Sequence, residues 1–384
     1  MSKTILIIPT LLFSASVMAQ SIIQLKIKSL PVYHPSGSDI YAAGSFNGWN
    51  AQDDNYKFQH DKDGNYFLDL KLEQGVYEYK ITRGGWDKTE CKKDGESIGN
   101  RLLKVEENTS IELTIEEWVD RFPAVPKKST ASKNVQIIDT AFLIPQLKRT
   151  RRVWIYLPET YATGTERFPV LYIQDGQNVF DDATAYSGEW GVDEYLDSLG
   201  KHIKKCIVVA IDNGGTKRLN EYCPYNFKLT GAAAVSKSNK GEGNAYVDFV
   251  VKTLKPFVDK NYRTSKEKEN TFVAGSSLGG LISLYAVLKY PAVFGGAGVF
   301  SPAFWIAPKI FDDIKARGKK VSSKIYFFAG ELESETIIQG TRKAYDEMKR
   351  VSKSKMEIVI REDGKHNEEA WRNEFGFFYE WILK

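Results

Sequence analysis

The chain of 384 residues is long enough for two or three domains, and its 42% hydrophobic and 13% aromatic residues allow a sizeable buried core. The formal net charge of +4 is small for this length, and no stripe of Lys and Arg alternates with aromatic residues, which argues against a nucleic-acid partner. After the first residues, no stretch is apolar over the length of a membrane-spanning helix, so no membrane span is expected.

Residues 1–19 have the pattern of a secretory signal peptide. Lys3 provides the positive start, Ile5–Val17 forms an apolar run, and Val17-Met18-Ala19 is a small-residue cleavage site. The apolar run is too short to cross a bilayer, and no Cys follows the cleavage site, so neither a membrane anchor nor a bacterial lipid anchor is indicated. We therefore expect a periplasmic or secreted mature protein.

Three cysteines remain, Cys91, Cys206 and Cys223, and an odd count leaves at least one free thiol in an exported protein. Cys206 and Cys223 are the nearer pair in sequence, but the sequence does not decide whether they form a disulfide. Cys206 begins the apolar run that ends at Ile211, which favours a buried, inert thiol. No spacing is typical of a zinc site, and we expect no metal and no organic cofactor.

Residues 20–120 show short strand patterns separated by turn residues. Strands this short and this regular predict a small all-β sandwich domain. The expected strands are Ser21–Leu30, Ile40–Ala43, Asn65–Leu72, Val76–Thr82 and Ser110–Ile115.

One segment of this domain, Ala42-Ala43-Gly44-Ser45-Phe46-Asn47-Gly48-Trp49-Asn50, resembles the G-x-F-N-x-W signature of glycogen- and starch-binding sandwich modules. The later run Tyr77–Thr82 and Trp86 are also similar to that family. The resemblance implies exposed Trp rings that stack on sugar rings. The alternative is that Trp49 and Phe46 are core residues and that the domain is a spacer or helps to shape a neighbouring site.

Residues 121–133 are rich in Pro, Lys and Ser and predict a linker. From residue 134 to residue 384, continuous apolar strand patterns alternate with helical ones, which predicts an α/β fold with a mostly parallel sheet covered on both faces. The first two strands follow one another without a helix, so the sheet is expected to open with an antiparallel pair, in the order of an α/β-hydrolase. The expected strands are Val135–Phe142, Arg152–Leu157, Val170–Gln174, Cys206–Ile211, Thr271–Ala274, Ala297–Phe300, Ser323–Phe328 and Met356–Ile360, and the expected helices are Ala245–Tyr262, Leu278–Tyr290, Thr336–Val351 and Glu368–Leu383.

The segment Thr271–Pro291 carries the strongest chemical signal. Its centre, Gly275-Ser276-Ser277-Leu278-Gly279, is a G-x-S-x-G elbow between a strand and a helix. Glycines two residues before and after the serine leave room for a sharp turn, and only Ser277 has them in register. The helix that follows directs its N-terminal N–H groups and positive dipole end towards the serine, where an oxyanion would form.

A serine nucleophile needs a base, and His366 is the only His after Ser277, in the loop between the last strand and the last helix. His202 precedes a strand and would lie at the opposite end of the sheet. The acid that orients the base should follow the strand Ser323–Phe328, and Glu333 is our first choice. Glu331 in the same loop and Asp363, three residues before His366, remain competitors.

Two backbone donors are expected to form an oxyanion hole. One is the N–H of Leu278, directly after the nucleophile. The other should come from the loop Asp175-Gly176-Gln177-Asn178 after a predicted strand, and we favour Gln177.

These motifs as a set resemble the esterase D family, which is similar to enterochelin, feruloyl and acetylxylan esterases, S-formylglutathione hydrolases and mycolyltransferases. The segments that carry the resemblance are Leu171–Asp181, Glu189–Asp193, Arg218 with Glu221, the Ser277 elbow, and Gly364–Glu368 with Trp371. The resemblance implies a triad of Ser277, His366 and a glutamate near position 333. It also implies that Trp190, Arg218 and Glu221 line the cleft, whereas their ordinary alternatives are a core Trp and a surface ion pair.

The expected function is an exported serine esterase that forms an acyl-enzyme. The favoured substrate is a carbohydrate-linked ester, with feruloyl or acetyl groups on plant polysaccharide, because a starch-module-like domain precedes the hydrolase and the chain is exported. A catecholate siderophore esterase is the alternative within the enzyme class. A non-catalytic carbohydrate-binding protein with an inactive hydrolase domain is the alternative from another class. The sequence does not indicate the oligomeric state.

Overall fold

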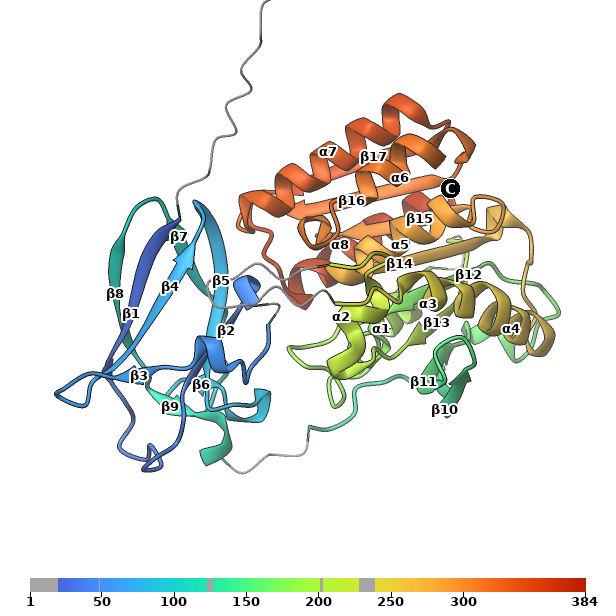
Figure 1. Ribbon diagram of the computed structural model, residues 1–384. Helices are drawn as coiled ribbons and strands as arrows, with labels where there is room; N and C mark the ends of the chain where they lie inside the picture. Colours follow the sequence, from blue (N-terminus) through green and yellow to red (C-terminus); the bar gives the residue numbers. More distant parts are fainter. Residues whose placement is uncertain (1–19, 48, 123–126, 201–202, 228–238) are drawn as a thin grey trace, which may run out of the picture.

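The computed structural model describes residues 20–47, 49–122, 127–200, 203–227 and 239–384 (Figure 1). The chain forms an N-terminal β region, residues 20–122, and a larger α/β region, residues 127–384. The predicted signal peptide and His202 lie outside the described residues. No helix in the described ranges is long and apolar enough to cross a membrane.

The N-terminal β region consists of two main sheets that enclose one hydrophobic cluster. One sheet has the strand order β3-β4-β1-β8 and the other has the order β2-β5-β7. Burial alternates residue by residue along β1, as the period of two in a strand requires, so that Ile23, Leu25 and Ile27 point into the cluster. The bounds are β1 Ser21–Ser29, β2 Tyr41–Gly44, β3 Gln59–His60, β4 Tyr66–Leu72, β5 Gly75–Thr82, β6 Glu90–Cys91, β7 Arg101–Val105, β8 Thr109–Thr114 and β9 Glu117–Trp118.

The five strands expected in this region are present with small shifts at their ends. The structure adds β7, which the sequence pattern did not predict and which pairs antiparallel with β5, and also the two-residue strands β3, β6 and β9. The β7 sequence Arg-Leu-Leu-Lys-Val does not alternate cleanly, because the apolar Leu102 is exposed while Leu103 and Val105 are buried.

The α/β region is built on one mixed eight-stranded sheet, in the order β10-β11-β13-β12-β14-β15-β16-β17. The pairs β10–β11 and β11–β13 are antiparallel, and every later pair is parallel, so the predicted antiparallel opening is confirmed. The strand order reverses between β12 and β14, and in open α/β sheets such a reversal opens a crevice beyond the carboxyl ends of the strands. The bounds are β10 Val135–Ile144, β11 Arg149–Tyr156, β12 Val170–Gln174, β13 Ile207–Ile211, β14 Thr271–Ser276, β15 Gly296–Phe300, β16 Lys324–Gly330 and β17 Lys355–Arg361.

Helices cover both faces of this sheet, as its continuous apolar strands predict. Along β12, Val170 and Tyr172 join one hydrophobic cluster, whereas Leu171 and Ile173 join the cluster on the other face. Helices α2 to α7 pack on the first face, and α1 and α8 pack on the second. The bounds are α1 Val192–Ser198, α2 Arg218–Tyr222, α3 Gly243–Phe249, α4 Lys255–Asn261, α5 Leu278–Lys289, α6 Ile310–Arg317, α7 Glu335–Val351 and α8 Glu368–Leu383, with a π-helical turn, Val250–Leu254, that joins α3 to α4.

The described part of the predicted linker, residues 127–133, is hydrogen-bonded to the α/β region. The Ser129 hydroxyl donates to the Asp181 carboxylate (2.9 Å), and the Thr130 hydroxyl donates to Glu189 (2.8 Å). The segment is therefore held against the α/β region by side chains that the composition of the linker did not reveal.

The two regions meet along β5. Figure 1 shows the N-terminal β region beside the α/β region, with β5 on the facing side, and β5 contacts α7. A second contact joins the ring of Trp86 to that of Tyr186, whose centroids are 5.8 Å apart in an edge-to-face arrangement. Because Tyr186 lies on the loop after Gly176–Asn178, the N-terminal β region reaches the neighbourhood of the predicted oxyanion loop.

Candidate active site

Ser277 forms the tip of the turn between β14 and α5. Its backbone has φ 57° and ψ −118°, a conformation that a residue with a side chain adopts only under constraint. A Cβ on Gly275 would lie 2.9 Å from the Cβ of Gln174, so the turn requires glycine there. Between Thr271 and Leu288, Ser277 alone is not buried. The neighbouring hydroxyl of Ser276 is buried, which places Ser277 as the accessible serine of the elbow.

His366 lies after β17 and contacts Glu333, which follows β16. The distance from His366 Nδ1 to Glu333 Oε2 is 2.9 Å, and the Glu333 side chain has no exposed surface. The competing acids Glu331 and Asp363 are both exposed. Of the three candidates, Glu333 is the residue that the fold brings to the imidazole.

Two glycines explain how the loops after β16 and β17 come together. A Cβ on Gly330 would lie 2.1 Å from the carbonyl oxygen of Gly364, so the two backbones touch. The N–H of Leu332 donates to that same carbonyl (3.0 Å). This backbone contact fixes the loop of Glu333 against the loop of His366.

Sequence reasoning missed Ser301, which connects the acid to the rest of the site. Its hydroxyl donates to Glu333 Oε1 (2.6 Å) and accepts from the indole N–H of Trp371 (2.9 Å). The Gly330 N–H also donates to Glu333 Oε1 (2.8 Å), so both carboxylate oxygens have partners. Ser301 directly follows β15, and its place at the carboxyl end of a central strand is the signal that could have identified it.

The electrostatic environment favours a charged imidazole. Burial by itself would lower the pKa of His366, but the hydrogen bond and charge of Glu333, with the charges of Glu78 and Glu368, raise that pKa above its ordinary value. Glu368 is itself perturbed, because burial raises the pKa of its carboxyl to about 7. Glu78 belongs to β5, so a carboxylate of the N-terminal β region acts on the candidate base.

The loop after β12 contains Gln177, the predicted second oxyanion donor. Asp175, the first residue of this loop, has φ 57°. Arg218 donates two hydrogen bonds to the Asp175 carboxylate, from Nε to Oδ1 (2.6 Å) and from Nη2 to Oδ2 (2.9 Å). The Gln177 side-chain oxygen accepts from the N–H of Asn213 (3.1 Å). This loop lies next to the Ser277 turn because β12 and β14 are neighbours in the sheet. Leu278, the other predicted donor, is the first residue of α5.

Three residues were expected to line the cleft, and their positions differ. Trp190 is only 4% exposed and packs against Phe300 and Trp371, so it supports the site from the core. Glu221 is fully buried and pairs with Arg149 and Arg151. Both side chains thus lie in the interior, which fits the alternative of a core Trp at position 190. Arg218 is partly exposed, but its guanidinium is engaged in holding Asp175.

All three cysteines are free and buried, so the Cys206–Cys223 disulfide that the sequence left open is not formed. Burial raises the pKa of the Cys206 thiol to about 12 and that of Cys223 to about 11, which keeps both thiols protonated and inert.

The arrangement has the parts of an acyl-transfer site. Three contacts link the carboxyl ends of β14 to β17: the Ala303 N–H donates to the Ser277 backbone carbonyl (3.0 Å), the Ser301 hydroxyl donates to Glu333, and Glu333 contacts His366. Such a turn presents a serine oxygen, and a carboxylate-bound imidazole can exchange its proton.

Parts of the chain are similar in sequence to known proteins. Bacillus subtilis YbbA is 32% identical over 160 residues, which cover 40% of this chain and 58% of that protein. An endo-1,4-beta-xylanase/feruloyl esterase of Xylanibacter ruminicola is 27% identical over 225 residues, covering 57% of this chain and 27% of that enzyme. The chain thus spans 58% or less of these two relatives.

Among solved structures, the enterobactin esterase FES from Shigella flexneri has a TM-score of 0.52 at 17% identity, with 94% of this chain and 92% of that chain covered. At such low identity the likeness shows the fold alone, but it extends over nearly the whole chain. The sequence profile of the family described as "Putative esterase" matches residues 144–376, more than half of the chain. The chain therefore belongs to the Putative esterase family.

Proposed function

We propose that the chain is a serine esterase whose triad is Ser277, His366 and Glu333. Ser277 Oγ attacks the ester carbonyl while His366 accepts its proton, and His366 then returns the proton to the leaving alcohol. Water repeats the sequence on the acyl-enzyme and releases the acid. Backbone N–H groups of Leu278 and Gln177 stabilise the oxyanion. The observation that carries the proposal is the buried Glu333–His366 pair beside the strained serine turn.

Hydrolysis of a chromogenic short-chain ester tests this proposal. Ser277→Ala is expected to abolish the activity, because the nucleophile is removed. Ser276→Ala is the matched control, since it deletes a hydroxyl from the adjacent buried residue and should retain activity. Equal rates for wild type and Ser277→Ala would exclude Ser277 as the nucleophile, and no activity in the wild type on any ester would favour the non-catalytic alternative.

For the substrate, we propose acyl groups, feruloyl or acetyl, on plant polysaccharide, and an exported protein that meets them outside the cell. A set of aromatic rings between the two regions supports this choice. Trp49 and Trp86 are 6.2 Å apart between ring centroids, Trp86 contacts Tyr186, and Tyr186 is 57% exposed. Partly exposed aromatic rings provide apolar faces on which sugar rings stack. The relative from Xylanibacter ruminicola, named a xylanase/feruloyl esterase, points to the same substrate class.

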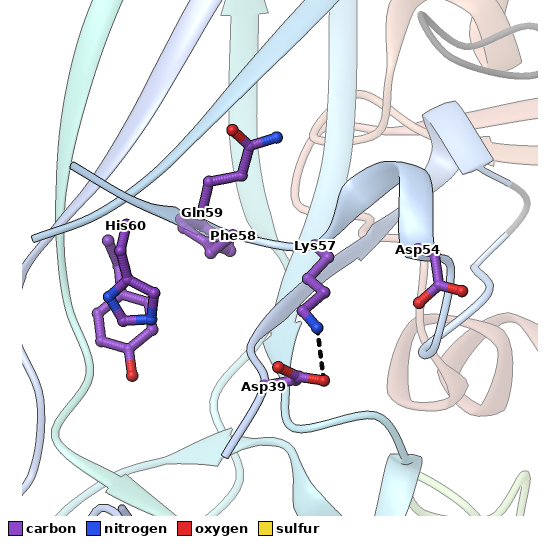
Figure 2. A pocket seen from close by; sticks show the side chains of 7 residues that line it. Asp39, Asp54, Lys57, Phe58, Gln59 and His60 are labelled. Atoms are coloured by element: carbon purple, nitrogen blue, oxygen red, sulfur yellow. Dashed lines mark ion pairs between the residues drawn. The ribbon is translucent and has the colours of Figure 1, made fainter. Parts of the chain in front are cut away.

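A different pocket of the N-terminal β region does not support the substrate assignment. Figure 2 shows this hollow of about 320 Å³, in which Lys57 pairs with Asp39 at 2.7 Å and His60 lies beside Tyr66. None of its lining residues belongs to the aromatic set, and none comes from the α/β region. The exposed Lys57–Asp39 ion pair contributes little energy to this pocket. We place the substrate at the junction of the two regions instead, because the exposed aromatic rings lie there.

A catecholate siderophore esterase is the second candidate, favoured by the fold likeness to the Shigella flexneri enterobactin esterase over both regions. A panel of methyl ferulate, acetylated xylan and a catecholate trilactone separates the two. A kcat/KM highest for the trilactone would overturn the polysaccharide proposal while leaving the triad intact.

A further inference from the structure

Three carboxylates gather at the start of α1, next to Trp190 in the sequence. Glu189, Asp193 and Glu194 each offer an oxygen, and these oxygens all lie within 4.8 Å of one another. Glu189 is 6% exposed and Asp193 is fully buried, whereas Glu194 is exposed. The cluster therefore opens to solvent on the side of Glu194 and is closed on the side of the other two.

Each buried carboxylate uses one oxygen and leaves the other without a partner. Glu189 Oε1 accepts from the hydroxyl of Thr130 (2.8 Å), and Asp193 Oδ2 accepts from the N–H of Ser132 (2.7 Å). Glu189 Oε2 and Asp193 Oδ1 are buried and have no hydrogen-bond partner among the described residues. Native proteins rarely leave a buried carboxylate oxygen unsatisfied, because the lost hydration is costly.

No basic side chain of the described residues bonds to these three carboxylates. The guanidinium of Arg372 donates from Nε to the backbone carbonyl of Glu189 (2.8 Å), and its charge acts to lower the pKa of Glu189 without a bond to the carboxylate. Three like charges at this separation repel one another, and the repulsion is strong where water is excluded. A bound cation would relieve this repulsion and give the two unpartnered oxygens a ligand.

We propose that Glu189, Asp193 and Glu194 bind a hard divalent cation, with calcium as the ion that fits best. Calcium binds oxygen ligands at about 2.3–2.6 Å, so oxygens that share one ion lie at most about 4.6–5.2 Å apart, and the oxygens of this cluster, all within 4.8 Å of one another, meet this limit. The donor set has no imidazole or thiolate, which disfavours zinc and copper. The exposed side at Glu194 admits water to complete the coordination.

The position of the cation gives it a structural role. Thr130 and Ser132 bond to the same carboxylates, so the ion holds the segment between the two regions against α1. Glu189 also precedes Trp190, which packs on Trp371. The ion thus supports the wall behind the candidate base without contacting the reacting groups, and the proposal does not depend on the identity of the ester.

The test uses the purified full chain. After dialysis against chelator, added calcium is expected to bind at one ion per chain by elemental analysis and to raise the Tm by a few degrees. Terbium should give sensitised luminescence on excitation of tryptophan, because Trp190 adjoins Glu189, and calcium should displace it. Glu194→Gln removes only an exposed ligand and should weaken calcium binding by at least about tenfold, since ligand charge tunes affinity. Glu369→Gln, an exposed acid on α8, is the matched control and should bind calcium like the wild type.

A proton shared within the cluster is the competing explanation. Burial raises the pKa of Asp193 to about 8, so a protonated Asp193 could donate to Glu194 at neutral pH. In that case the chain would retain no calcium, terbium would give no sensitised signal, and Tm would not respond to calcium at millimolar concentration. Any of these results at pH 8.5, where the carboxylates are most fully ionised, would overturn the proposal. An equal affinity in wild type and Glu194→Gln would place the ion elsewhere.

Discussion

Glu333→Gln tests the proposed catalytic role of this acid while it preserves the volume of the side chain. Glu333 Oε1 accepts from Ser301 and from the Gly330 N–H, while Oε2 faces His366 Nδ1 at 2.9 Å. A glutamine in the same volume can keep its carbonyl oxygen at the Oε1 position, because only an acceptor suits the two donors there. Its amide NH₂ then faces Nδ1, which must become an acceptor, so the imidazole proton moves to Nε2, where a free base is required.

The expected loss follows from this wrong tautomer. When the acid of a serine triad is replaced by its amide, kcat falls by about 10⁴-fold. Each factor of ten corresponds to about 1.36 kcal/mol, so the barrier should rise by about 5.5 kcal/mol. KM should change little, because Glu333 is buried and does not face the substrate.

The assay compares kcat and KM on a short-chain chromogenic ester for wild type, Glu333→Gln and Glu331→Gln, with Tm as a check on folding. Glu331 is exposed in the same loop and is the matched control, which should lose less than about threefold because surface substitutions rarely disturb their surroundings. The reasoning is refuted if Glu331→Gln shows the large loss, or if Glu333→Gln retains more than about a tenth of wild-type kcat while folded.

Three further predictions concern the surroundings of the site. Trp86→Ala should weaken retardation of the chain in gels that contain soluble polysaccharide and should raise KM for acetylated xylan, because an aromatic face at the junction is lost. Arg218→Lys replaces a bidentate hydrogen-bonded contact with the Asp175 carboxylate by a point charge. It should lower kcat on a small ester about ten- to hundredfold, because the loop that carries Gln177 is no longer held in place. The midpoint of the acid limb in the pH profile of kcat/KM should lie above pH 6.5, because the pKa of His366 is raised and only its neutral form accepts a proton. Glu78→Gln should move that midpoint to lower pH, because it removes a charge that favours the imidazolium.

Controls and contradictory outcomes differ among these three. Phe377→Ala removes an exposed ring on α8 and should leave retardation unchanged; wild-type chain that is not retarded by any polysaccharide would favour a spacer role for the N-terminal β region. Unchanged kcat in Arg218→Lys would show that the loop does not need the bidentate contact. Glu112→Gln, on the other sheet, is the control for Glu78→Gln, and a limb that moves equally in both or in neither would contradict a direct effect of Glu78 on His366.

The local patterns predicted the fold of the α/β region well. All eight strands and the four expected helices appear, because continuous apolar runs and helical periods are properties of neighbouring residues. The short helices α1, α2 and α6 were not predicted, since helices of eight residues or fewer give a weak periodic signal. In the N-terminal β region, β7 was missed because Leu102 and Leu103 break the alternation.

In the candidate site, too, the sequence indicated the features that depend on neighbouring residues and not those that depend on distant ones. The elbow of Ser277 could be identified from sequence, because its glycines lie within two residues of the serine and the strain is local. Spacing after the strand favoured Glu333 but left Glu331 and Asp363 open, because the contact with His366 depends on the meeting of Gly330 and Gly364 across two strands.

The sequence by itself determined most of the longer elements, the order of the chemical groups along the chain and the candidate nucleophile, since each depends on residues a few positions apart. Only the tertiary structure decided what depends on distant residues meeting. In the folded chain, Ser301 donates a hydrogen bond to Glu333, and Trp190 and Glu221 are buried in the interior. The charge of Glu78 in the N-terminal β region raises the pKa of His366. Burial and electrostatic coupling are properties of the whole packing, and a linear pattern does not contain them.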